Sequence, residues 1–364
     1  MIVYLINLLV VVVFSSLAMR YANSNNRNQF KGVKANIFFM WIPIISMSYI
    51  ASIRYWVGTD YGNYKDLFYL ASNSDKWFTG DDVLFSASLK LIDNIFHDDK
   101  AMFAIYGSLI VVLGVYAIRN ISNTFAFSMF LFVAMMFYYS SFNGIRQWFV
   151  SMVMFLCYPL YCNKKYKILI PIIIVCYFMH SSFIYYVLVY FIVKSKAWGK
   201  VMASVIAGGI AVYLFFAPAI GAFLSMSNSD GRYSTMYGDM LLESGSGANI
   251  LRLVVACIPV VISFVFYKQL KRTRKDIDIL INFSVINMLL MLLATRHWLF
   301  ARFSIYFDVY NIILIPQFVY IFKEKDRKLV RLVIYVLFFF YMYVLLHVDS
   351  ELLPYKTIYG HYFP

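Results

Sequence analysis

The sequence has few charged residues and no long polar stretch, and both shortages exclude a sizeable soluble domain. Only 14% of the 364 residues are charged, 62% are hydrophobic, and the mean hydropathy is +0.71. The longest polar gap, Arg54 to Lys100, itself contains the apolar segment Val83 to Phe96. Apolar runs of about 18 to 20 residues recur along the chain, and runs of that length cross a bilayer as helices. The sequence therefore predicts an integral membrane protein.

Several catalytic motifs are also missing. No Walker A sequence, HExxH or G-x-S-x-G occurs, which argues against a P-loop NTPase, a zincin and an α/β-hydrolase. The four cysteines lie in apolar runs without a CxxC pair, so they indicate neither a disulfide framework nor a metal site. The single D-x-D, Asp276 to Asp278, follows a basic run and resembles ordinary charges at a helix start. We expect no metal and no cofactor.

The pattern of apolar runs predicts an all-α polytopic membrane protein of about 12 transmembrane helices, with a range of 10 to 12. We treat residues 1–364 as one integral membrane domain with outer loops at 54–100 and 225–249. The expected spans are 2–19, 35–53, 101–118, 124–142, 145–162, 168–180, 182–193, 201–224, 250–267, 277–295, 299–322 and 329–348.

The net charge of +14 indicates orientation rather than nucleic-acid binding. Alternate loops carry 21 of the 32 lysines and arginines, which assigns them to the cytoplasm. No basic residue precedes the first apolar run, so we expect a retained helix rather than a signal peptide, with both termini outside. The cytoplasmic loops are 20–34, 119–123, 163–167, 194–200, 268–276 and 323–331.

The expected outer face is poor in basic residues, yet six of those that remain are arginines. Three of them stand two residues before a tryptophan at a membrane border. Such residues can be interfacial anchors, or they can bind phosphate through the guanidinium fork. The six outer arginines are Arg54, Arg146, Arg232, Arg252, Arg296 and Arg302.

Further polar residues stand at span ends or inside spans. The turn at Asn143-Gly144 begins a helix, whose free N–H groups beside Arg146 predict an anion site. His180 lies at an outer helix end, as a structural residue or a general base. Asp308 lies inside a span, either in a structural ion pair or at a reaction site.

Four segments together resemble the EpsG-type, Wzy-like polymerases of bacterial surface polysaccharides. They are "RYWVGTDYGNYKDLF" from Arg54, "NGIRQWFVSMVMF" from Asn143, "MHSSFIYYVLVYF" from Met179 and "RFSIYFDVYNIILIP" from Arg302. The resemblance implies a glycosyltransferase-C-like helical bundle with a cavity at its outer face. It also implies a metal-independent glycosyltransferase that joins oligosaccharide repeat units carried on undecaprenyl diphosphate.

The resemblance further suggests roles for individual residues. His180 and Asp60 are the catalytic candidates, and the six outer arginines are candidates for binding the diphosphate. The sugar-binding candidates are Tyr55, Trp56, Tyr61, Tyr64, Gln147, Trp148 and Tyr306.

The implied location is the outer face of the bacterial cytoplasmic membrane. The implied partners are the lipid-linked oligosaccharide, the growing polysaccharide, membrane lipids, a chain-length regulator and a flippase, without nucleic acid. Two other functions remain open. A flippase for the lipid-linked oligosaccharide would place its cations along a lumen, and a membrane O-acyltransferase would pair a histidine with an acid reached from the cytoplasm.

Overall fold

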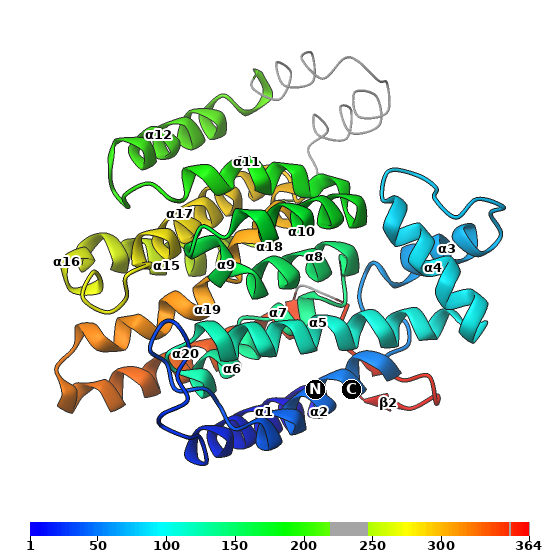
Figure 1. The fold of residues 1–364 in the computed structure, drawn as a ribbon, viewed down its shortest axis with the longest axis horizontal. Coiled ribbons are helices and arrows are strands. Elements are labelled where there is room, and N and C mark those ends of the chain that lie inside the picture. The colour runs from blue at the N-terminus through cyan, green and yellow to red at the C-terminus, as the bar shows by residue number, and fades with distance from the viewer. Residues whose placement is uncertain (219–246, 349–350, 364) are drawn as a thin grey trace. The chain divides into compact units, whose positions relative to one another are not determined.

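The computed structural model describes residues 1–218, 247–348 and 351–363, and they form two compact units. The first unit comprises Met1–Val187 and Phe322–Pro364, and the second comprises Leu188–Ile321. Both units are built from apolar helices, as Figure 1 shows, and the one described sheet is a two-stranded hairpin near the C-terminus. The predicted all-α membrane fold is thus confirmed.

The first unit contains most of the candidate site residues that were predicted from the sequence. Its helices begin with α1 (Ile2–Arg20), α2 (Ile37–Ile53), α3 (Tyr61–Ser72), α4 (Val83–Phe96), α5 (Asp99–Ile121), α6 (Phe125–Ala134) and α7 (Phe137–Ser140). They continue with α8 (Ile145–Leu156), α9 (Tyr158–Cys162), α10 (Tyr166–Met179), η1 (Ser181–Phe183), η3 (Glu324–Asp326) and α20 (Arg327–Val348). The hairpin strands are β1 (Tyr355–Lys356) and β2 (Tyr362–Phe363).

The second unit follows on from α11 (Ile184–Ile192), which spans the division between the units. Its other described helices are α12 (Lys200–Leu214), α15 (Ile250–Val265), α16 (Tyr267–Leu270), α17 (Ile277–Ala294), α18 (Leu299–Asp308), α19 (Asn311–Leu314) and η2 (Ile315–Ile321). Helix α17 is its most buried long helix, and the ring of Phe283 stacks on Tyr310 with centroids 4.0 Å apart. Asp308 accepts hydrogen bonds from Asn287 and Asn311 inside this unit.

Eleven predicted spans coincide with a described helix or a broken set of helices, and the twelfth, 201–224, begins as α12 and ends outside the described residues. The count of twelve crossings is not confirmed. Among the described residues, four helices are long and apolar enough to cross a membrane: α1, α5, α17 and the stretch Glu324–Val348. The pair Leu299–Asp308 and Asn311–Ile321, bent by 42°, adds a fifth if it counts as one span. The remaining apolar helices have 10 to 17 residues, which is short for a straight crossing.

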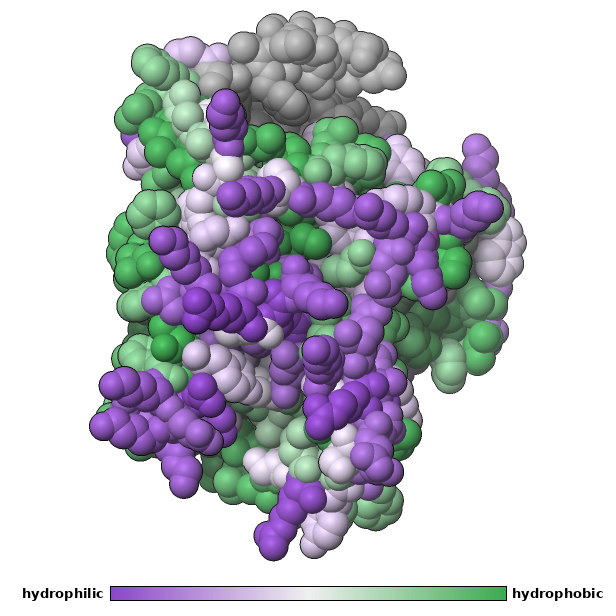
Figure 2. All heavy atoms as spheres, turned by 60° about the vertical axis from the view of Figure 1, so that its left-hand side comes forward, coloured by the Kyte–Doolittle hydropathy of each residue, from purple (hydrophilic) through white to green (hydrophobic). Residues whose placement is uncertain are grey.

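In the first unit, the loops assigned to the cytoplasm gather at one end. The Asn28 side chain donates to the carbonyl of Ser122 at 2.8 Å, and Asn163 donates to Gln29 at 2.6 Å. These bonds connect loops 20–34, 119–123 and 163–167. Figure 2 shows the molecule from the side of these loops. Hydrophilic residues gather on this face, with hydrophobic residues to either side. The gathering agrees with the alternation of charge in the sequence.

The two termini lie together at the other end of this unit (Figure 1), where the C-terminal hairpin contacts the segment 54–64, here called the Arg54 corner. The Tyr4 hydroxyl donates to the carbonyl of Leu352, and the Tyr355 hydroxyl donates to the carbonyl of Ile50. The N–H of Ile358 donates to the carbonyl of Ile53 at 2.9 Å. The N-terminus, the C-terminal hairpin and the corner therefore share one end of the first unit.

Candidate active site

The Arg54 side chain is enclosed at the end of α2. It is 2% exposed, and its Nη1 donates to the carbonyls of Val57 at 3.0 Å and Phe142 at 2.8 Å. Its guanidinium also lies 4.5 Å from the centroid of the Phe142 ring. Burial lowers the pKa of Arg54 to about 10, so the side chain is still charged at neutral pH. In this arrangement Arg54 fastens the corner to the α7–α8 turn, and its role in diphosphate binding stays a prediction.

Asp60 occupies the start of α8, where the sequence analysis expected free N–H groups. Its Oδ2 accepts from the N–H of Gly144 at 2.8 Å, and its own N–H donates to Asn143 Oδ1 at 3.2 Å. The N–H of Arg146 donates to the Tyr64 hydroxyl at 3.3 Å. The helix start therefore does hold an anion, as its chemistry predicts, but the anion is a carboxylate of the chain itself. The catalytic role assigned to Asp60 stays a prediction beside this structural one.

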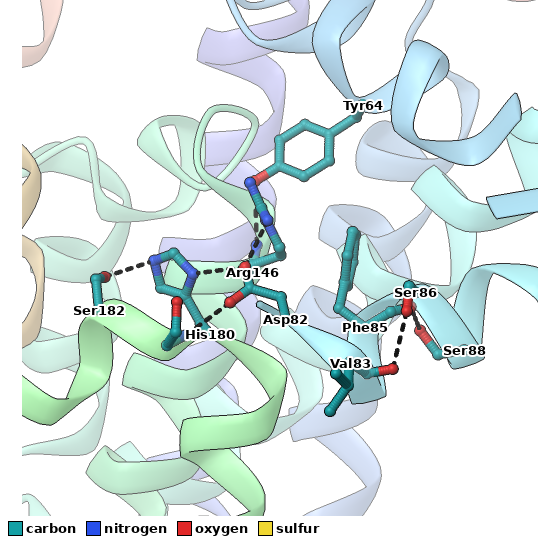
Figure 3. Close-up of polar contacts among 10 residues, drawn as sticks. Tyr64, Asp82, Val83, Phe85, Ser86, Ser88, Arg146, His180 and Ser182 are labelled. Atoms are coloured by element: carbon teal, nitrogen blue, oxygen red, sulfur yellow. Dashed lines mark hydrogen bonds and ion pairs between the residues drawn. The ribbon is translucent and has the colours of Figure 1, made fainter. Parts of the chain in front are cut away.

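Asp82 brings together residues from two other segments (Figure 3). Its Oδ2 accepts from Arg146 Nη1 at 2.5 Å and lies 3.2 Å from Nδ1 of His180, while its Oδ1 accepts from the N–H of Ser181 at 2.7 Å. Asp82 is the residue before α4, Arg146 is in the first turn of α8, and His180 ends α10. One carboxylate at the start of α4 thus joins a guanidinium at the start of α8 and an imidazole at the end of α10.

The contacts of His180 fix which ring nitrogen carries the proton. Because Asp82 is a carboxylate that can only accept, Nδ1 is the protonated nitrogen in the neutral ring. Nε2 is then the acceptor, and it lies 2.9 Å from the hydroxyl of Ser182. The imidazole therefore presents its basic nitrogen to a hydroxyl oxygen, which is the geometry a general base requires.

The charge state of Asp82 follows from its surroundings. Burial acts to raise the pKa of Asp82, but the hydrogen bond from His180 and the charge of Arg146 outweigh burial and lower it to about 2. The side chains remain partly open to solvent, with exposed fractions of 11% for Asp82, 18% for His180 and 27% for Arg146. Asp82 is thus ionised at neutral pH, and the cluster is partly open to solvent.

Arg146 retains donor capacity after binding Asp82. Its guanidinium lies 5.3 Å from the ring centroid of Phe85 and 5.8 Å from that of Tyr64. Its Nε is buried and finds no acceptor among the described residues. A guanidinium has five N–H donors, so Arg146 can hold Asp82 and an anionic ligand together.

The remaining candidates fall into two groups within the first unit. Tyr55 and Trp56 expose their rings, at 38% and 49%. Tyr61, Gln147 and Trp148 are buried, and Tyr61 stacks on Phe103 with centroids 4.1 Å apart. The buried members of this set offer no open face to a sugar in this structure, so any role for them in sugar binding stays a prediction.

Other candidates belong to the second unit or fall outside the described residues. Tyr306 is buried there, Arg302 lies 5.1 Å from the ring centroid of Trp298, and Arg296 lies 4.7 Å from that of Tyr213. Arg252 is at the start of α15 and interacts electrostatically with Asp308. Arg232 lies outside the described residues, as does most of the expected outer loop 225–249. The convergence of these arginines with Arg146 stays a prediction.

Asp82 and Ser182 were not among the site residues predicted from the sequence. Asp81 and Asp82 precede an apolar run, and acidic residues in that position are usually ordinary helix-start charges. Ser182 follows His180 by two residues, and only the histidine of "MHSS" was predicted to belong to the site. An acidic residue before the short outer helix, considered together with the histidine, was the available signal.

Comparison with curated proteins and with solved structures found no match. The comparison with protein families did find one, and its range includes the corner at Arg54, the start of α8 and the end of α10. The resemblance inferred from the sequence is thereby confirmed, and the apolar helices agree with a multi-pass membrane protein. Because the family model matches residues 37–357, most of the chain, this protein belongs to the EpsG family, a family of Wzy-like polysaccharide polymerases.

Proposed function

We propose that this protein joins oligosaccharide repeat units carried on undecaprenyl diphosphate, at the outer face of the bacterial cytoplasmic membrane. Membership of the EpsG family supports a polymerase of polysaccharide biosynthesis. The observation that carries the proposal is the Asp82 cluster. Here an imidazole with its basic nitrogen facing a hydroxyl stands beside a guanidinium whose Nε has no hydrogen-bond partner among the described residues.

The reaction needs a base for the acceptor and a cation for the leaving group. In the proposed step, the acceptor hydroxyl takes the position of the Ser182 hydroxyl and gives its proton to Nε2 of His180. Its oxygen forms a bond to the anomeric carbon of the donor sugar. The bond from that carbon to the diphosphate breaks, and the electron pair leaves with the diphosphate oxygen.

Asp82 and Arg146 act on the two ends of this step. Asp82 holds Nδ1 protonated and stabilises the imidazolium that forms when Nε2 takes the proton. Arg146 donates to the developing negative charge on the diphosphate, which strengthens that contact in the transition state. The resting Asp82–Arg146 pair keeps the guanidinium placed before substrate arrives.

Deletion of the gene and substitution of His180 test this proposal. Without the protein, lipid-linked single repeat units should accumulate and surface polymer should disappear. A general base contributes about 10²- to 10⁴-fold to a rate, so His180→Gln should lower polymer formation by that order. Long polymer at the normal level in the His180→Gln strain, with equal protein in the membrane, would contradict the role of His180.

A second candidate function, acyl transfer to polysaccharide, has one observation in its favour. Asp82, His180 and Ser182 follow one another through hydrogen bonds in the order of a serine-nucleophile triad. Ser182→Ala separates the two functions, because acyl transfer through Ser182 needs its oxygen and glycosyl transfer does not. We expect Ser182→Ala to keep polymer formation within a few-fold of the natural protein.

A further inference from the structure

A hollow opens at the same end of the first unit as the Arg54 corner. Its volume is about 310 Å³. Its wall includes Tyr55 from the corner, Lys100 from the first turn of α5, and Lys356, Thr357 and Tyr362 from the C-terminal hairpin. None of these residues takes part in the Asp82 cluster.

Backbone hydrogen bonds fix the hairpin against the corner, so the hollow has a defined wall. The N–H of Tyr55 donates to the carbonyl of Lys356 at 2.9 Å, and Arg54 forms an isolated antiparallel bridge with Thr357. Gly360 turns the hairpin with a φ of 79°, a conformation that favours glycine. Tyr355, which is 1% exposed, anchors the first strand beneath the hollow.

The wall combines positive charge with exposed aromatic faces. Two lysines line the hollow, and no carboxylate is among its lining residues. Lys100 does pair with Asp98 at 3.5 Å, but both side chains are nearly half exposed, and such a pair contributes little. Tyr55 and Tyr362 expose 38% and 66% of their surface. Lysines recognise anionic groups, and tyrosine rings offer faces to the C–H surfaces of sugars.

We propose that this hollow binds an acidic sugar residue of the polysaccharide, such as a uronic acid or a phosphorylated sugar. The inference rests on the proposed function only in taking the ligand to be a glycan. The anionic group would lie between Lys100 and Lys356, and the sugar ring would lie against Tyr55, because Lys356 Nζ already lies over the Tyr362 ring, 5.6 Å from its centroid. Part of the wall, Ile358 to Tyr362, follows the last residue that the EpsG family model matches. This wall would therefore adapt the polymerase to the particular glycan it extends.

Direct binding measurements test the proposal without any polymerisation. The protein is placed in nanodiscs of zwitterionic phosphatidylcholine and titrated with a trimer of galacturonic acid, and with a galactose trimer as the neutral comparison. We expect the acidic trimer to bind at least about tenfold more tightly, since charge-assisted contacts add to affinity. The double variant Lys100→Gln, Lys356→Gln should lose that difference. The matched control is Lys76→Gln, an exposed lysine of the same outer segment that does not line the hollow.

Each other outcome overturns the proposal. Equal binding by the natural protein and the double variant would exclude the two lysines. If Lys76→Gln weakened binding of the acidic trimer as much as the double variant does, the trimer would be held by the general positive charge of the surface and not by the hollow. If nothing binds in phosphatidylcholine, and a spin-labelled phosphatidylglycerol is immobilised by the natural protein but not by the double variant, the hollow is a lipid headgroup site. His180→Gln distinguishes this proposal from the function above, because it should stop polymerisation and leave trimer binding unchanged.

Discussion

Asp82 accepts hydrogen bonds from the Arg146 guanidinium and the Ser181 N–H and contacts the His180 ring. Each partner favours the ionised carboxylate, and together they lower the pKa of Asp82 to about 2 against burial. A neutral residue in its place would leave the imidazole free to rotate and the guanidinium without its anchor. At the scale of single residues, the site therefore depends on a carboxylate that touches no substrate in the proposed step.

The lowered pKa of Asp82 predicts how its contribution to stability varies with pH. Its folded-state pKa of about 2 lies below the ordinary value of 3.8, so the contribution is present above pH 3.8 and is lost as pH falls through about 2. The thermal midpoint of the purified protein in detergent should exceed that of Asp82→Asn at pH 5. The gap should narrow steadily between pH 4 and pH 2. A gap that stays constant over this range would show that the ionised carboxylate is not what stabilises the fold.

Substitution of Arg146 by lysine tests whether the site needs the forked guanidinium or only a positive charge. Losing one charge-assisted contact costs about 1.5 to 3 kcal/mol, or roughly ten- to a hundredfold in rate if that contact tightens in the transition state. Arg146→Lys should therefore shorten or abolish the polymer on a gel, at an unchanged level of membrane protein. Arg20→Lys, at an exposed position at the end of α1, is the control and should give normal chains. Normal chains with lysine at position 146 would reduce Arg146 to an interfacial anchor.

The sequence could supply some of these residues and not others. Arg146 and His180 carried signals of their own: an arginine at a helix start and a histidine at a helix end. Asp82 carried only the pattern of an acidic residue before an apolar segment, which does not point to partners 64 positions away at Arg146 and 98 positions away at His180. The burial of Arg54 was equally hidden, since the carbonyl of Phe142 that it binds is 88 positions away. Only folding brings these partners together.

At the scale of helices, the hydropathy of the sequence predicted where the helices lie. It did not predict where a span is broken into two helices. The apolar segment Val83 to Phe96, noted inside the polar gap, is helix α4 with those same bounds. The predicted span 124–142 is instead broken between α6 and α7, where Met136 has a φ of 69°. A break between two apolar residues leaves no trace in hydropathy, because both sides remain equally apolar.

Within the Arg54 corner, the backbone conformation and the close packing at Gly58 both require glycine. Its φ is +96°, and an added Cβ would lie 2.5 Å from Asn143 Oδ1, which accepts the N–H of Asp60. Gly58→Ala should therefore push Asn143 away and loosen the start of α8, at a cost of at least about 1 kcal/mol beyond backbone strain. Gly80→Ala is a matched control, since Gly80 has a φ of +67° with open space around it.

Thermal unfolding of both glycine variants makes the comparison. The midpoint should fall by several degrees more for Gly58→Ala than for Gly80→Ala. Equal changes would mean that left-handed backbone strain alone accounts for both, and that the contact with Asn143 is dispensable.

For the whole molecule, the distribution of charge anticipated which loops share an end of the first unit. The loops at 20–34, 119–123 and 163–167 are joined there by hydrogen bonds. The number of crossings was harder to predict, because several apolar helices are shorter than a bilayer is thick. Tilt, breakage and re-entrance all give such helices the same composition, so sequence periodicity does not separate them.

Labelling of introduced cysteines tests the orientation. In a background with the four native cysteines replaced by alanine, Lys76→Cys should react with an impermeant thiol reagent added to intact cells. Ser24→Cys, in the loop after α1, should react only after the membrane is opened. Both positions are exposed in the structure, so accessibility does not favour either. Labelling of Ser24→Cys in intact cells would put the Asp82 cluster on the cytoplasmic side.

Reconstitution tests the central claim, that this membrane protein forms glycosidic bonds between lipid-linked repeat units. The purified protein would be placed in liposomes whose outer leaflet carries repeat units extracted from a strain lacking the gene. The account predicts glycans of two and more units, with one polyprenyl diphosphate released for each bond formed. It also predicts that the His180→Gln protein gives neither product. Repeat units that remain single while moving between the leaflets would contradict the account and identify a flippase instead.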